Sequence, residues 1–153
     1  MTIKATLESK QLQNAHAFLA LMSVPDFDGV AELLAPNFML EFFPESLSPP
    51  GGKHALNGKE TVKFFKRATD DVFEYIVYLP PLYTFQGPDA VVIHVKSEGM
   101  TKSQRKYENE YMYTFQFCGE KIVKLGQFVD SKYYAEFFGA GGVAAAGACD
   151  SDA

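Results

Sequence analysis

The chain has 153 residues, the size of one globular domain, and 47% of them are hydrophobic, which excludes a disordered protein. Its formal net charge is −5, and its basic residues form one small cluster at Lys102, Arg105 and Lys106 rather than a stripe, so we expect no nucleic-acid partner. Cys118 and Cys149 provide neither a disulfide framework nor the close spacing of a zinc site, so we expect no metal and no cofactor.

The first seventy residues predict three helices and one short strand. Apolar residues recur at helical spacing in the first helix, Asp26 is suited to cap the second, and Pro36 is expected to stop it. Two prolines and two glycines in the segment after the strand predict a loop. The expected elements are helices over 6–23 and from Asp26, a strand over 37–43, a loop over 44–58 and a helix over about 59–70.

After Asp71 the apolar pattern changes to a period of two, which predicts strands. The expected strands cover 72–86 with a break at Pro80 and Pro81, then 90–98, 107–117 and 122–130. A last short helix is expected over 132–138, and the Gly- and Ala-rich segment 139–153 is expected to be a flexible tail. Helices followed by a meander of long strands predict a single α+β domain over 1–138.

No stretch of sequence approaches the roughly twenty apolar residues of a membrane helix, and polar residues interrupt the approach to the apolar segment 15–24. We therefore expect a cytoplasmic protein with no membrane partner. Fourteen Phe and eight Tyr without any Trp indicate a core or cavity lined by aromatic rings.

Three segments of the sequence match motifs of one known family. Residues 58–65 read GKETVKFF and resemble the G-x-E-x-[VI]-x-x-[FW] opening of the family's third helix. Residues 107–117, YENEYMYTFQF, are similar to its Y-x-N-x-Y-x-x-x-F strand, and residues 120–130, EKIVKLGQFVD, to the strand that follows. Together these segments resemble the SnoaL-like family of the nuclear-transport-factor-2-like (NTF2-like) superfamily, and the resemblance spans roughly residues 10–138.

This resemblance implies a cone-shaped roll, in which a strongly bent antiparallel sheet wraps around the N-terminal helices and encloses a pocket. The superfamily includes polyketide cyclases, limonene-epoxide hydrolase, scytalone dehydratase, ketosteroid isomerase and phenazine-biosynthesis proteins, and also members that only bind partners. Fold alone therefore does not determine the function.

Strand alternation predicts which side chains face the pocket. On 107–117 the inward face carries Asn109, Tyr111 and Tyr113, and on the last strand Val123, Leu125, Gln127 and Val129 share the apolar face. We expect Asn109, Tyr111 and Gln127 to line one cavity, although Asn109 and Tyr111 would also suit a plain core strand. Catalytic members of the resembled family carry Asp or Glu at the position of Gln127, and a neutral amide cannot replace them in proton transfer.

The strand over 90–98 allows two orientations. Its more apolar face carries Val91, Ile93 and Val95, whereas the register implied by the family places His94 and Glu98 inside. In that second register His94 is a candidate general base with Glu98 beside it, and Tyr111 or Asn109 would hold a developing oxyanion. In the first register they lie on an exposed polar face.

His54, on the loop before the third helix, is a further candidate for substrate contact, and Tyr113 a candidate binding residue. Two functions remain open. The first is a metal-free and nucleotide-free enzyme (an isomerase, cyclase, dehydratase or hydrolase) acting by proton transfer on a small apolar metabolite such as a polyketide or terpenoid. The second is a non-catalytic domain that binds a small ligand or a protein. We also expect a homodimer through the outer sheet face, which carries Met112, Thr114 and Gln116 beside two glutamates.

Overall fold

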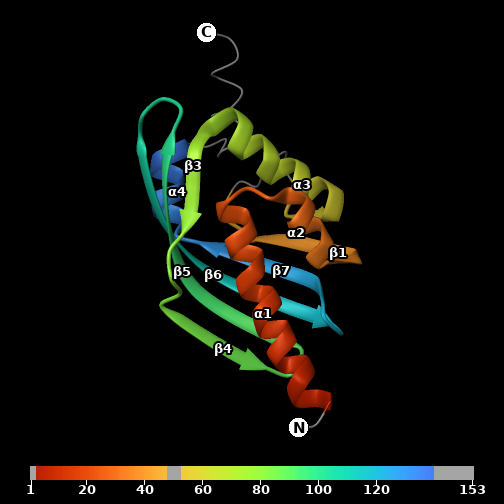
Figure 1. The fold of residues 1–153 in the computed structure, drawn as a ribbon. Coiled ribbons are helices and arrows are strands. Elements are labelled where there is room, and N and C mark those ends of the chain that lie inside the picture. The colour runs from red at the N-terminus through yellow and green to blue at the C-terminus, as the bar shows by residue number, and fades with distance from the viewer. Residues whose placement is uncertain (1–2, 48–52, 140–153) are drawn as a thin grey trace.

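A computed structural model describes residues 3–47 and 53–139 of the chain, and its helices and strands follow the expected order (Figure 1). Residues 140–153, most of the expected tail, lie outside the described residues. The helices are α1 (Ile3–Ser23), α2 (Phe27–Leu33), α3 (Gly58–Arg67), the π-helical turn η2 (Ala68–Val72) and α4 (Ser131–Phe138). The strands are β1 (Leu34–Phe43), β2 (Ala55–Asn57), β3 (Phe73–Tyr78), β4 (Tyr83–Gly87), β5 (Ala90–Thr101), β6 (Lys106–Cys118) and β7 (Lys121–Val129).

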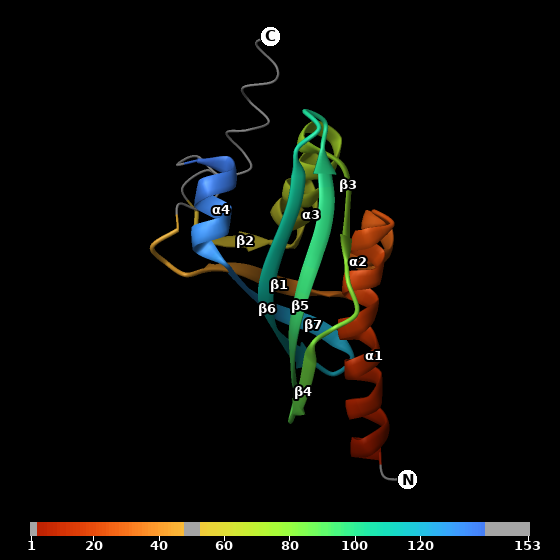
Figure 2. The same ribbon diagram turned by 90° about the vertical axis from the view of Figure 1, so that its left-hand side faces the viewer.

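The strands form one strongly bent sheet in the order β2-β1-β7-β6-β5-β3, and β4 also pairs with β5. Neighbouring strands are antiparallel except β1 and β7, which run parallel. Helix α1 crosses β5, β6 and β7 in Figure 1. In Figure 2 α4 lies at the left, after the end of β7, and α1 lies at the right. This arrangement confirms the expected α+β fold class, with one parallel strand pair added.

Aspartates cap the starts of two short helices, and the cap at Asp26 was predicted from the sequence. The Asp26 side chain accepts a hydrogen bond from Gly29 N at the start of α2, and Asp130 accepts one from Tyr133 N at the start of α4. Each carboxylate satisfies a backbone donor that the first helical turn leaves free.

Two expectations near the first strand are wrong. Strand β1 begins at Leu34 rather than at residue 37, and Pro36 lies inside it instead of ending a helix. The register with β7 shifts between Leu34 and Met39, so Pro36 falls where the ladder is irregular and its missing N–H is not needed. The expected loop 44–58 also contains the short strand β2, which at three residues has no readable periodicity.

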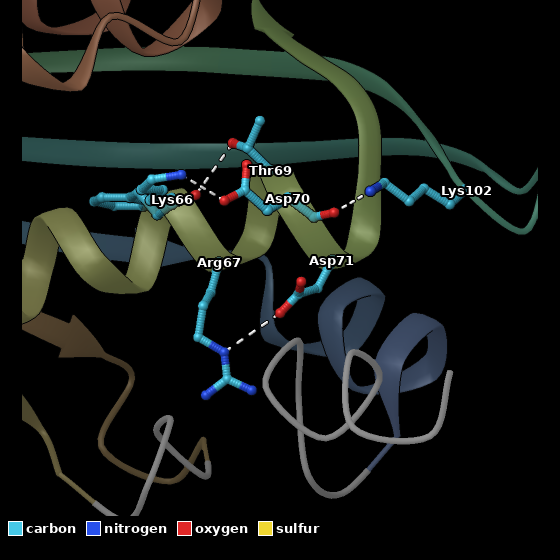
Figure 3. Close-up of polar contacts among 7 residues, drawn as sticks. Lys66, Arg67, Thr69, Asp70, Asp71 and Lys102 are labelled. Carbon is cyan, nitrogen blue, oxygen red and sulfur yellow. Dashed lines mark hydrogen bonds and ion pairs between the residues drawn. The ribbon is translucent and has the colours of Figure 1, made fainter. Parts of the chain in front are cut away.

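The turn η2 is fixed by polar contacts along its exposed side (Figure 3). Lys66 pairs with Asp70 at 2.6 Å, Arg67 pairs with Asp71 at 3.4 Å, and Lys102 donates to the backbone oxygen of Asp70. Each exposed pair contributes little alone. Together they hold the chain where it passes from α3 into β3, and the inner side of this turn forms part of the pocket described below.

Strand β6 alternates as predicted: all odd-numbered residues from Tyr107 to Phe117 are buried. On β7 the prediction fails at Val123. The register between β6 and β7 shifts there, because Phe117 pairs with Ile122 and Gln116 pairs with Lys124. Val123 is the extra residue of this bulge, so Ile122 takes the buried position that was expected for Val123.

Candidate ligand pocket

A cavity of about 70 Å³ lies between α3, the turn η2, α4 and the inner face of the sheet. That is several times the roughly 10–15 Å³ that one water requires. Most of its wall is aromatic or aliphatic, with three tyrosines from strands, one from α4, Gln127 and Thr69 as its polar side chains. The lining residues are Met22, Phe42, Phe43, Leu47, Phe64, Phe65, Ala68, Thr69, Phe73, Ile76, Tyr78, Tyr107, Tyr111, Gln127, Val129, Tyr134 and Phe138.

Tyr107 and Tyr111 join a buried hydrogen-bonded chain at one wall of the pocket. Ser97 Oγ donates to the Tyr111 hydroxyl at 3.2 Å, and Asn109 Nδ2 donates to the Tyr107 hydroxyl at 2.9 Å. The two phenol oxygens are 3.0 Å apart and share one hydrogen bond. Asn109 Oδ1 in turn accepts from Glu110 N at 2.7 Å, so the amide is fixed at both ends.

A second phenol pair lies beside the first. The hydroxyls of Tyr78 and Tyr113 are 2.5 Å apart. The Tyr78 ring meets the rings of both Tyr111 and Tyr113 edge-on, at centroid distances of 5.7 and 5.6 Å. Tyr113 is fully buried behind the pocket, whereas Tyr78 lines it. The rings therefore hold one another in fixed positions.

Gln127 is the polar group of the wall on β7. Its Oε1 atom is buried and accepts no hydrogen bond from any described residue. A buried acceptor without a partner costs roughly 1–3 kcal/mol, so native proteins rarely retain one without a reason.

Burial controls the protonation of the phenols. Desolvation raises the pKa of Tyr78, Tyr107 and Tyr113 well above the ordinary value for tyrosine. It also raises the pKa of Tyr111, to about 12, but the hydrogen bonds from Ser97 and Tyr107 oppose this rise. All four phenols are consequently neutral hydrogen-bonding groups near pH 7.

The structure brings only part of the predicted site together. Tyr111 and Gln127 line the cavity as expected, and Tyr113 supports it from behind. Asn109 is buried but does not line the cavity, because its amide is hydrogen-bonded to Tyr107 and to the backbone of β6. His54 is exposed and is not among the lining residues.

His94 and Glu98 lie outside the pocket, which corrects the register implied by the family. Strand β5 buries Val91, Ile93 and Val95, the face that the apolar pattern favours, and its even-numbered side chains point outward. His94 stacks on Tyr83 and lies 3.6 Å from a Glu110 carboxylate oxygen, while Glu98 is exposed.

Three lining tyrosines were not among the predicted site residues. Tyr107 could have been identified, because it shares its strand face with Tyr111. Tyr78 and Tyr134 could not, because β3 has no clear alternation and α4 shows its role only when packed against the sheet.

Within the described residues, no group of three or more His, Cys, Asp or Glu side chains is placed to hold a metal ion. Among the same residues, no helix is both long and apolar enough to cross a membrane.

Comparison with known proteins shows the fold of the chain. No protein-family model matches the sequence, and no curated protein matches it either. Among solved structures, BvnE pinacolase from Penicillium brevicompactum is similar with a TM-score of 0.73 and 24% identity, over 96% of this chain and 99% of that one. PrhC from Penicillium brasilianum has a TM-score of 0.76 and 16% identity, over 92% and 97%. TerC, co-crystallised with polyporic acid, has a TM-score of 0.70 and 16% identity, over 83% and 96%.

Proposed function

We propose that this chain, which has the NTF2-like fold expected from its resemblance to SnoaL-like proteins, binds a small apolar metabolite such as a polyketide or terpenoid in the ring-lined pocket. The observation that carries this proposal is Gln127 Oε1, which is buried in a mostly aromatic and aliphatic wall and has no hydrogen-bond partner among the described residues. An apolar cavity with a few fixed polar groups is the usual form of a small-molecule site. Among its fold neighbours, TerC was crystallised with a small organic molecule, polyporic acid.

Binding can be tested with acetophenone, a small aromatic ketone, by following its NMR signals during titration with the protein. We expect saturable binding that Ala68→Leu weakens, because this change adds three carbon atoms to the pocket wall. The matched control is Ala31→Leu on the exposed side of α2, which should bind like the parent protein. Binding that is unchanged by Ala68→Leu would place the ligand elsewhere and contradict the proposal.

A catalytic role is the second candidate, and the Tyr111 hydroxyl favours it. Its oxygen accepts a hydrogen bond from Ser97 and shares one with the Tyr107 hydroxyl, so it belongs to a polarised phenol pair at the cavity wall, suited to stabilise an oxyanion that develops on a bound carbonyl. His94 and Glu98 are not part of this candidate, because both point away from the pocket. The described lining supplies no carboxylate or imidazole, so a bound water would carry the proton in a metal-free isomerase- or lyase-type reaction.

Hydrogen exchange tests the catalytic candidate without a known substrate. In D₂O, enolisation exchanges the methyl protons of acetophenone, and donation from Tyr111 should accelerate this exchange. Removal of one such donor costs on the order of 10²-fold in rate, so Tyr111→Phe should return the exchange close to the protein-free rate. If the parent protein exchanges these protons no faster than the protein-free solution does, the catalytic candidate is wrong and ligand binding is the remaining proposal.

We also propose a homodimer through the outer face of the sheet. Register places Tyr83, His94, Met112 and Phe128 in one row across β4, β5, β6 and β7. Tyr83 and Phe128 are 61% and 51% exposed, and with Met112 they form an exposed apolar patch of the kind that marks an interaction surface. Sedimentation at micromolar concentration should show a dimer that Phe128→Asp dissociates, whereas Val24→Asp, at an exposed apolar site off the sheet, should not. A monomeric parent protein would refute this proposal.

A further inference from the structure

Among the hydrogen bonds of residues 3–47 and 53–139, the count of phenol protons leaves one donor over at the pocket wall. The Asn109 amide donates to Tyr107 and the Ser97 hydroxyl donates to Tyr111, so neither phenol proton is used in these two bonds. The single bond between Tyr107 and Tyr111 uses one phenol proton and leaves the other. Whichever tyrosine keeps it, that tyrosine lines the cavity.

The same count applies to Tyr78 and Tyr113. One bond joins two hydroxyls, so one proton of this pair also has no acceptor within it. If Tyr78 donated, the proton of Tyr113 would be left in the core, where an unpaired polar group is costly. The favourable arrangement has Tyr113 donating to Tyr78, and the Tyr78 proton then faces the cavity.

The matching acceptor is on the neighbouring strand. Tyr111 pairs with Val129 and Tyr113 pairs with Gln127, so Gln127 is the diagonal neighbour of Tyr111 on the same face. Diagonal side chains on adjacent strands start about 7–8 Å apart and approach one another as they extend inward. Gln127, whose Oε1 has no partner among the described residues, and the phenol donors therefore belong to the same wall of the cavity.

We infer that the ligand of this pocket carries two neutral polar groups close together on an apolar frame, a carbonyl that accepts from the phenols and a hydroxyl that donates to Gln127 Oε1. A hydroxy ketone has this chemistry. A simple hydrocarbon would leave all three protein groups unpaired, and a charged ligand would be buried without a counter-ion. This inference rests on the proposed ligand-binding function of the same cavity.

Three probes of similar shape separate the contributions: ethylbenzene, acetophenone, and α-hydroxyacetophenone, which adds a hydroxyl beside the carbonyl. NMR titration should give affinities that rise about fivefold with each added group, the size of one net hydrogen bond. If no probe binds, the proposed function fails. If all three bind with equal affinity, the proposed function stands and the inference about polar groups is overturned.

Variants assign each gain to a side chain. Gln127→Met keeps the length of the side chain but lacks the acceptor, so it should abolish the advantage of α-hydroxyacetophenone over acetophenone. A triple variant, Tyr78→Phe with Tyr107→Phe and Tyr111→Phe, should abolish the advantage of acetophenone over ethylbenzene, because either Tyr107 or Tyr111 can keep the free phenol proton. Tyr75→Phe, at a half-exposed tyrosine outside the pocket, should keep both. If Gln127→Met still binds α-hydroxyacetophenone more tightly than acetophenone, the assignment of the acceptor to Gln127 is wrong. If a variant does not fold, the three affinities of the parent protein still test the inference.

Discussion

Gly99 on β5 lets β3 approach closely, and Gly99→Ala should push the two strands apart. A Cβ at this buried position would lie 2.7 Å from the backbone oxygen of Tyr75 and 3.3 Å from Ile76 Cα. Real Cβ atoms essentially never come closer than 3.0 Å, and backbone cannot rotate away as a side chain can. Overpacking of this kind costs roughly 1–3 kcal/mol, and the lower chain entropy of alanine in the unfolded state returns about 0.4–1 kcal/mol.

The expected net loss is about 1–2 kcal/mol in the free energy of unfolding, or roughly 2–8 °C in melting temperature for a chain of this size. Because Ile76 and Tyr78 of β3 line the pocket, acetophenone should also bind more weakly. Urea denaturation measures the stability, and Gly87→Ala is the control, since a Cβ there meets nothing within 4 Å. A Gly99→Ala variant as stable as Gly87→Ala would refute the reasoning.

Two further predictions concern stability. Gln127→Met should stabilise the ligand-free protein by about 1–2 kcal/mol in urea denaturation, because it removes a buried acceptor that no described residue satisfies. A loss of stability would mean that the amide is satisfied in the folded state. Raised tyrosine pKa values imply that stability is constant below the unfolded-state pKa, near pH 10, and falls as pH rises from 10 through the folded value of about 12 for Tyr111. The free energy of unfolding from urea denaturation should fall by up to about 1.4 kcal/mol per pH unit for each such tyrosine, and less steeply in Tyr111→Phe.

Periodicity predicted the fold well where one face of an element is buried and the other is exposed. Strand β6 alternates over its full length, and the capping aspartates mark two helix starts. The prediction failed at Pro36 and Val123, where an irregular ladder or a bulge changes the pairing by one residue. Such a shift depends on the partner strand, which no local pattern describes.

The site was predictable only in part, for a related reason. On β5 the apolar pattern favoured the orientation that the structure has, while the register implied by the family favoured the opposite one. The placement of His94 in the pocket was wrong because it followed the register of the resembled family, whereas the apolar residues of the strand already indicated which face is buried. Asn109 lies on the predicted face of its strand, but its hydrogen bond to Tyr107 holds its side chain behind the cavity wall. Only the three-dimensional contacts reveal this.

The phenol-rich wall also gives the protein an optical reporter. The chain has no tryptophan and eight tyrosines, and four of these, Tyr78, Tyr107, Tyr111 and Tyr134, line the one cavity proposed to take the ligand. Near-ultraviolet circular dichroism of this protein therefore arises largely from rings whose packing a ligand would alter. Occupancy of the pocket can be followed without a label, and a compound that binds only to the outer face of the sheet would leave most of this signal unchanged.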